Sequence, residues 1–498
     1  MTLDQLTESV LTVSPELLDA REAAAIVESC GVNDRIARSD FGMQSTFDLG
    51  DHILRYSRTR ETPQPQCEPK RESVLLREAS FAARKFSLSF AYALPWMALL
   101  IVEYLRPKLL QLSPEWGGIL SLSLIASLIG AGGFSQAITR TGYFYIGVKE
   151  PKLALKLCLL FVKWGCITAC ALGLLGFVLA NYFSLFAPVY LVAGAFNYLV
   201  LVALWMFCAM LSVQGHVWRI PLVFVFGGIA FTVLHRGLGG VAPLFVANVV
   251  ALGCAAGLSV WGFRSLPSTS PADAPTPPLP RLPVLLFMLT PFFLYGLCYF
   301  AFLFADRIAA GSAIPWASGL SFGIDSRYKQ GMDVALFIFL VLAAVVEYMV
   351  DNFMRYWFAL AEESGLNVPH LLKMRYQRFL LYICALFALL ATGLWLTYSR
   401  FEPDVLVTAV LGSVGYFFAA LALFNLIILF SLNRAERALG LMAIALVCNG
   451  LSGYVLSHLF GVEFAAIGLL AGGLILFALS YRVIAVVLRE ADYFYALA

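Results

Sequence analysis

Long apolar runs are the feature that most constrains the fold of this chain. About twelve runs of roughly 17 to 28 residues contain few charges, and each is long enough to cross a bilayer as a helix. A spanning segment must satisfy its backbone hydrogen bonds within itself, which a helix does. The runs lie at residues 88–105, 118–138, 157–181, 187–212, 219–235, 241–262, 283–305, 334–353, 377–398, 404–431, 437–459 and 463–487. The sequence therefore predicts an all-α polytopic membrane protein.

The composition of the chain agrees with this fold class. Its 498 residues are 60% hydrophobic and 13% charged, with a mean hydropathy of +0.82, as is typical of polytopic membrane proteins. Most of the 10 cysteines lie inside apolar runs, no Cys-x-x-Cys pair occurs, and the five histidines are scattered. We therefore expect neither a metal nor a cofactor. The net charge of +3 argues neither for nor against a nucleic-acid partner, and we expect none.

A proline-rich segment divides the predicted helices into two sets. Residues 266–282, within "LPSTSPADAPTPPLPRLP", form a semi-rigid linker rather than a span. The linker separates a first six-helix lobe (83–265) from a second (283–498). Two sets of six helices enter the membrane in the same direction, as parallel repeats do.

Residues 1–82 precede the first lobe and are polar, so we expect a small cytosolic region. Within it, Ser14 as N-cap and Gly31 just past the end predict one helix, followed by a mixed, turn-rich stretch. The first residues have no basic start and no continuous apolar core, so they predict no signal peptide.

The orientation follows from Lys and Arg in the short loops. With a cytoplasmic N-terminus, the inner loops carry roughly twice as many Lys and Arg residues as the outer loops. The charge bias thus predicts a multi-pass membrane protein with both termini in the cytoplasm.

A line of charges follows one apolar run and is the first candidate site. After "VALFIFLVLAAVV", Glu347, Asp351 and Arg355 fall four residues apart on one helix face. An Asp351–Arg355 pair at a helix end would be merely structural. The carboxylate of Glu347 lies deeper, where it needs water or a partner, and so indicates a functional role.

Other charges stand near predicted helix ends. Glu103 lies at the outer end of the first predicted span, where it either pairs with neighbouring cations or faces a cavity. Asp306 and Arg307 mark the outer end of the seventh, where they either cap the helix or line an outward-facing opening.

No motif of a membrane-bound enzyme occurs. The chain has no G-x-S-x-G, no H-E-x-x-H and no Gly-rich phosphate loop. The polar N-terminal region is too short for a sugar-nucleotide enzyme, and the longest predicted outer loop, 307–332, has about 26 residues. We therefore expect a protein without catalytic activity.

Three stretches resemble the PelG-like exopolysaccharide exporters of the multidrug/oligosaccharidyl-lipid/polysaccharide (MOP) flippase superfamily. They are "LLREASFAARKFSLSFAYALPWM", "GGFSQAITRTGYFYIGVKEP", and "FLFADRIAAG" with the following "YKQGMDVALFIFLVLAAVVEYMVDNFMRYW". The resemblance covers about residues 75 to 490. The chain departs from the family pattern in its long polar N-terminus and in having Leu94 before Pro95 and Trp96.

The resemblance implies a transporter whose two lobes rock about a central cavity lined by the first, second, seventh and eighth helices. Residues in matching places are Glu103, Gln136, Arg140, Tyr299, Asp306, Glu347 and Asp351. The implied function is movement of a polysaccharide or lipid-linked glycan across the inner membrane in exopolysaccharide biosynthesis. A cytosolic glycosyltransferase could then dock on residues 1–82. Two alternatives stay open: a non-transporting scaffold that anchors a cytosolic glycan synthase, and a small-molecule exporter of the same fold.

Overall fold

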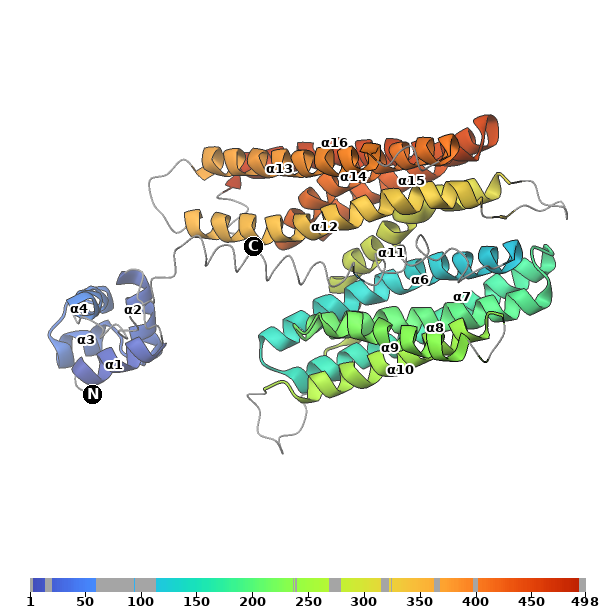
Figure 1. Cartoon of the computed structure of the whole chain (residues 1–498). Coiled ribbons are helices and arrows are strands. Elements are labelled where there is room, and N and C mark those ends of the chain that lie inside the picture. Colours follow the sequence, from blue (N-terminus) through green and yellow to red (C-terminus); the bar gives the residue numbers. More distant parts are fainter. Residues whose placement is uncertain are drawn as a thin grey trace. The chain divides into compact units, whose positions relative to one another are not determined.

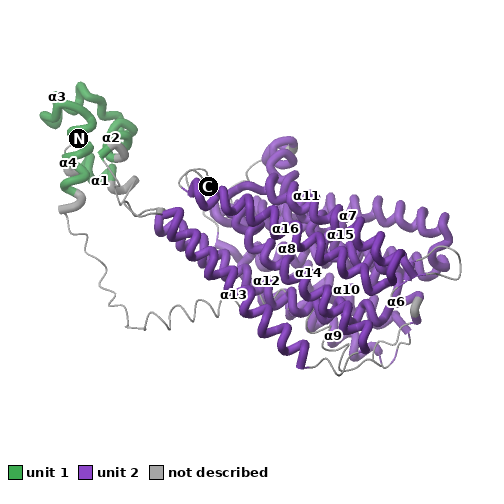
Figure 2. The backbone as a smooth tube through the Cα atoms, turned by 90° about the horizontal axis from the view of Figure 1, so that it is seen from above, with its two compact units in different colours: residues 1–78 green, residues 79–498 purple. Residues whose placement is uncertain are grey.

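The chain folds into two compact units, residues 1–78 and 79–498, coloured separately in Figure 2. A computed structural model covers the whole sequence. The residues that it describes are 3–13, 20–59, 94, 113–235, 237, 240–267, 279–314, 322–323, 325–361, 368–396 and 402–491.

The first unit contains, in its described part, four helices around a small apolar core. The helices are α1 (Leu3–Val13), α2 (Ala20–Ser29), α3 (Asp34–Phe41) and α4 (Thr46–Thr59). Helices this short are marginal alone and depend on burying one apolar face. The buried apolar cluster consists of Leu6, Val10, Val27, Val32, Ala37, Leu49 and Ile53.

Local capping chemistry defines α3, which lies in a stretch that the sequence predicts to be turn-rich. The Oδ1 atom of Asn33 accepts hydrogen bonds from the backbone N–H groups of Arg35 and Ile36, each at 3.1 Å. Gly42 ends the helix in the left-handed region, with φ +69°. The prediction of a turn-rich stretch is thus wrong here, because caps and a buried face compensate for weak helix propensity.

A buried threonine ties α4 to α3. The backbone N–H and the hydroxyl of Thr46 donate to Oδ1 of Asp34 at 2.8 and 3.1 Å. These hydrogen bonds favour the ionised carboxylate and lower the pKa of Asp34. Of the single helix predicted between Ser14 and Gly31, the structure describes α2 and the turn at Gly31, whose φ is +85°.

The second unit is a bundle of long helices (Figure 1). They are α6 (Pro114–Gly147), α7 (Pro151–Tyr182), α8 (Pro188–Val213), α9 (Arg219–His235), α10 (Ala242–Arg264), α11 (Leu282–Ser312), α12 (Ser326–Ala361), α13 (Val368–Leu396), α14 (Pro403–Ser431), α15 (Ala435–Phe460) and α16 (Ala465–Arg489), with a 3-10 turn, η2 (Val462–Phe464), before α16. Among the described residues no strand occurs, and ten of these helical segments are long and apolar enough to cross a membrane. The remaining one, α9, is shorter.

The predicted fold class is confirmed. Each predicted span from 118–138 onward coincides with one of these helices, whereas of the first, 88–105, the structure describes only Leu94. Several helices extend past the apolar runs, and α12 continues to Ala361. Many helices start with proline in the first turn, where its missing N–H has no partner to lose.

The helices form two lobes. In the first lobe α6 packs on α7 and α8, and α9 packs on α10. In the second lobe α14 packs between α12 and α16, and α15 packs on both α11 and α16. The largest buried apolar cluster among the described residues lies mainly in the second lobe and includes Tyr416, Phe353 and Phe424.

The lobes meet along α6 and α11, where glycines let two backbones touch. A Cβ atom on Gly132 would lie 2.6 Å from the carbonyl oxygen of Gly296, and a Cβ on Gly296 would meet the carbonyl oxygen of Gly132. Close by, the rings of Phe134 and Phe293 pack edge to face at 4.9 Å. The contact leaves no room for side chains between the two helices, so the lobes approach closely at this level.

The bundle has two ends that differ in charge. The end at which α6 finishes at Gly147 and α14 at Ser431 is called the basic end, because most loop Lys and Arg residues gather there. The opposite end is the one at which α11 finishes at Ser312 and α12 begins at Ser326.

Candidate functional site

A buried polar network joins α11, α12 and α14 near the opposite end of the second lobe. Asp306 of α11 is fully buried. The hydroxyl of Tyr328, on α12, donates to its Oδ2 atom at 2.7 Å. The Oδ1 atom is also buried and has no hydrogen-bond partner among the described residues.

Arg307, the next residue of α11, makes the other half of the network. Its Nη1 donates to the hydroxyl of Tyr416 at 3.1 Å, and its Nη2 donates to the Met332 carbonyl at 3.2 Å and to Oδ1 of Asp333 at 3.3 Å. The side chains of Arg307 and Asp333 are only 12% and 20% exposed. The Tyr416 hydroxyl in turn donates to the carbonyl oxygen of Leu303 at 3.0 Å. A charge this deep in a helix bundle requires such a set of partners.

The network holds two acids and two cations, so its formal charges cancel. Lys329 completes it, with Nζ 3.1 Å from Oδ2 of Asp333. A network without net charge costs less to bury in the lobe than an isolated charge would.

An N-cap fixes where α12 begins and thereby aligns its share of the network. The backbone N–H groups of Arg327 and Tyr328 both donate to Oδ1 of Asp325 at 2.8 Å. Helix α12 then starts at Ser326, and its first two turns direct Tyr328 and Asp333 toward α11.

The two residues on α11 do not cap it. The sequence analysis predicted that this helix ends at 305, but α11 continues to Ser312, so Asp306 and Arg307 lie inside it. The predicted outer loop of 307–332 is correspondingly shorter, with only 313–325 between the helices. The small residues of "RIAAGS" allow the helix to continue, and the network compensates for the buried charges.

Sequence reasoning missed four members of this network, namely Tyr328, Lys329, Asp333 and Tyr416. Asp333 follows Lys329 by four residues, a spacing that signals a helical ion pair once α12 is known to start at Ser326. Tyr328 and Tyr416 gave no such signal, because a tyrosine near a span end is read as an interfacial residue and one in the middle of a span as part of the core.

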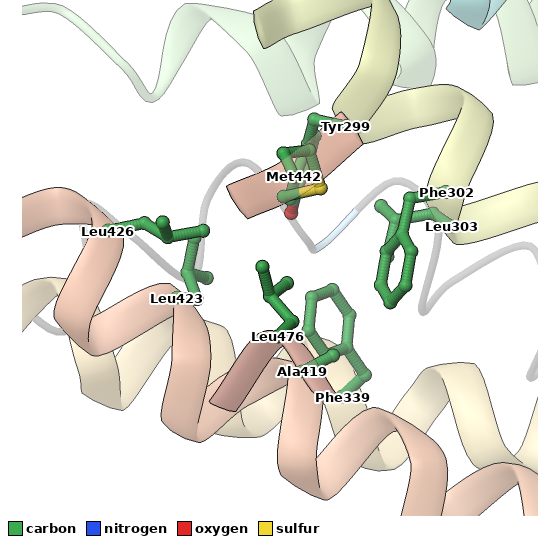
Figure 3. Close-up of a pocket in the computed structure, with 9 residues that line it drawn as sticks. All are labelled: Tyr299, Phe302, Leu303, Phe339, Ala419, Leu423, Leu426, Met442 and Leu476. Atoms are coloured by element: carbon green, nitrogen blue, oxygen red, sulfur yellow. The ribbon is translucent and has the colours of Figure 1, made fainter. Parts of the chain in front are cut away.

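A small cavity lies in the same lobe between α11, α12, α14, α15 and α16. It has a volume of about 10 Å³, room for roughly one water molecule. Figure 3 shows its lining, which is apolar except for the hydroxyl of Tyr299: Tyr299, Phe302, Leu303, Phe339, Ala419, Leu423, Leu426, Met442 and Leu476. The cavity is too small for a sugar. Tyr299 is close enough to Glu347 for the two to interact electrostatically.

The predicted line of charges on α12 is present nearer the basic end. Glu347 is exposed on the surface of the protein, and Asp351 is half-buried. Asp351 and Arg355 form an ion pair at 3.5 Å, with side chains 38% and 49% exposed. Glu347 lies about 21 Å along the helix from Asp333, so the line and the network are separate features.

The remaining predicted residues lie at the lobe contact or outside the described chain. The Cγ atom of Gln136 packs against Gly296, where an added Cβ would lie 2.7 Å from it. The guanidinium of Arg140 lies over the ring of Phe292, 5.0 Å from its centre. Glu103 lies outside the described residues. In this conformation the six described candidates lie in different places: Asp306 in the polar network, Tyr299 at the small cavity, Glu347 and Asp351 on α12, and Gln136 and Arg140 at the lobe contact. The part of the chain that the structure describes also contains no cluster of His, Cys, Asp and Glu able to hold a metal ion.

The arrangement of helices is similar to that of solved transporters, although no family model and no curated protein match the sequence. A variant of a Vibrio cholerae MATE transporter superposes with a TM-score of 0.57 at 14% identity, over 84% of this chain and 99% of that chain. An outward-facing multidrug resistance MATE family transporter of the MOP superfamily gives 0.52 at 16% identity, over 82% of this chain and 96% of that chain.

A third solved structure is a MOP superfamily transporter from Pyrococcus furiosus, described as having a binding pocket of reverse polarity. It superposes with a TM-score of 0.51 at 14% identity, over 81% of this chain and 97% of that chain. The chain therefore has the two-lobed helical fold of the MATE transporters. The predicted two-lobed helical fold is confirmed by this similarity, whereas membership of the MOP superfamily and of its PelG-like branch stays a prediction.

Proposed function

We propose that this chain is a membrane transporter whose two lobes rock against each other to expose a central cavity to either side of the membrane. The observation that carries the proposal is the fold, since the similarity to MATE transporters extends over both lobes. The direct backbone contact of α6 with α11 supports it, because a close contact between two lobes can act as a pivot.

The substrate that we propose is a polysaccharide or a lipid-linked glycan. This rests on the resemblance of the three sequence stretches to exopolysaccharide exporters. The exposed carboxylate of Glu347 and the hydroxyl of Tyr299 supply polar and aromatic groups of the kind that bind hydroxyl-rich ligands. Glu103, Gln136, Arg140, Tyr299, Asp306, Glu347 and Asp351 remain our candidates for groups that face the cavity during the cycle.

Two other functions have an observation in their favour. One of the similar structures is a multidrug resistance transporter, which favours a small-molecule exporter. The compact first unit, with its own apolar core, favours a scaffold that anchors a cytosolic glycan synthase. In our proposal this unit docks a cytosolic glycosyltransferase without replacing transport.

A deletion strain separates the three functions. We expect loss of secreted polysaccharide, restored by the full chain, with unchanged susceptibility to toxic small molecules. A chain lacking residues 1–78 should insert normally and lose co-purifying cytosolic proteins while it retains some export. Restoration of export by the first unit tethered to an unrelated membrane helix would instead support the scaffold. Altered drug susceptibility with normal polysaccharide would support the small-molecule exporter.

We also propose that the basic end faces the cytoplasm of a bacterial inner membrane. In whole cells carrying single-cysteine variants, an impermeant thiol reagent should label Phe183→Cys, at the opposite end, and spare Val148→Cys, at the basic end. Both positions are well exposed, at 46% and 52%. The reverse labelling pattern would invert the topology.

A further inference from the structure

A single arginine reaches from the first lobe to the second at the basic end. Arg140, on α6, donates from Nη2 to Oδ1 of Asn433, which follows α14, at 3.4 Å. Its guanidinium also lies 5.0 Å from the centre of the Phe292 ring on α11. Phe292 and Asn433 lie about 150 and 290 positions further along the chain than Arg140, and both belong to the second lobe.

The backbone around Asn433 aims its side chain at this contact. Helix α14 ends in a double turn: the Asn433 N–H donates to the Phe430 carbonyl at 3.0 Å, and the Arg434 N–H donates to the Leu429 carbonyl at 2.8 Å. This turn requires a left-handed residue, and Asn433 takes φ +56°. Asn and Asp are the side chains that tolerate this conformation best after glycine.

Aromatic packing holds the second-lobe face of the contact in place. Phe292 is 9% exposed, and its ring packs on Phe430 with centres 5.5 Å apart. Phe430 in turn meets Tyr295 edge to face at 4.5 Å. Arg140 therefore lies on a rigid aromatic surface, whereas its own side chain is exposed and can leave.

We infer that Arg140, Phe292 and Asn433 form a latch that holds the basic ends of the two lobes together, and that its release accompanies opening of the cavity at that end. The inference rests on the proposed transport cycle. The cation–π interaction and the long hydrogen bond are both weak at an exposed site. A weak latch biases the equilibrium between closed and open basic ends without locking it.

Asn433→Asp strengthens the latch while keeping the turn. The change places a carboxylate where Arg140 already donates, so the hydrogen bond becomes charge-assisted. Arg140→Gln weakens the latch by removing the charge that interacts with both partners. Nitroxide labels at Val148 and Glu436, one in each lobe at the basic end, report the separation of the lobes by pulsed electron paramagnetic resonance in a variant without native cysteines. The measurement uses the full chain in lipid nanodiscs and needs no substrate.

We expect Asn433→Asp to raise the ratio of short to long label distances about fivefold and Arg140→Gln to lower it by about the same factor. Arg219→Gln is the matched control: Arg219 lies 5.0 Å over the Trp261 ring and donates to Gln214 Oε1 at 3.0 Å, but all three residues belong to the first lobe. This variant should leave the ratio unchanged.

Distance distributions for Asn433→Asp and Arg140→Gln that match that of Arg219→Gln would overturn the latch. The same applies if both variants shift the ratio in one direction. If the label distances shift as expected but the protein exports neither glycan nor small molecule, the latch is supported and the proposed transport function is contradicted.

Discussion

Arg307→Ala is expected to lower the free energy of unfolding by about 3 kcal/mol, the low end of the range for breaking a buried ion pair. The substitution leaves the hydroxyl of Tyr416 and one oxygen of Asp333 without a donor in the interior of the second lobe. Lys329 still neutralises Asp333, which is why we expect the low end of the range.

The measurement is thermal or denaturant unfolding of the purified protein in detergent, followed through the loss of monodisperse material. Arg327→Ala is the matched control, because Arg327 pairs with Glu402 at 3.1 Å and Asp404 at 2.8 Å but is 57% exposed. A pair so open to solvent contributes about 0–1 kcal/mol. Equal losses in the two variants would show that the network contributes no more than a surface ion pair.

Glu347→Gln should reduce secreted polysaccharide to about a tenth, equivalent to about 1.4 kcal/mol in the limiting barrier, while protein level and insertion stay normal. Glutamine preserves the size of the side chain and removes its charge. The acid lies on an exposed face of α12, four residues before Asp351, so its loss should leave packing intact. In a transport cycle it would lose the ability to bind a proton or a cation as the lobes rock.

Ile338→Gln provides the contrast on the same helix. Ile338 is 4% exposed in the main apolar cluster, so an amide there has no partner and should lower the protein level itself. Both variants are scored as secreted polysaccharide per unit of membrane protein in the deletion strain. Normal export by Glu347→Gln, and also by a double variant with Asp351→Asn, would remove the line of acids from the mechanism.

The sequence by itself determined the class of fold and the positions of most helices. An apolar run of about twenty residues can do little in a bilayer except form a helix, so the spans from 118–138 to 463–487 could be read directly. The spacing of four residues in a helix predicted that Asp351 and Arg355 lie on one face, and the two form an ion pair there. Local rules predicted less in the first unit, where α4 depends on burying Leu49 and Ile53 against other helices.

Only the tertiary structure decided which polar residues meet. Arg307, Tyr416 and Asp333 are separated by up to 109 positions, and nothing in the sequence pairs them. The same holds for Arg140 and Asn433, which are 293 positions apart and come from different lobes. Hydropathy reports how each segment meets lipid, a property of the segment alone. The partner of a buried charge is instead set by how helices rotate and cross, which depends on packing over the whole bundle.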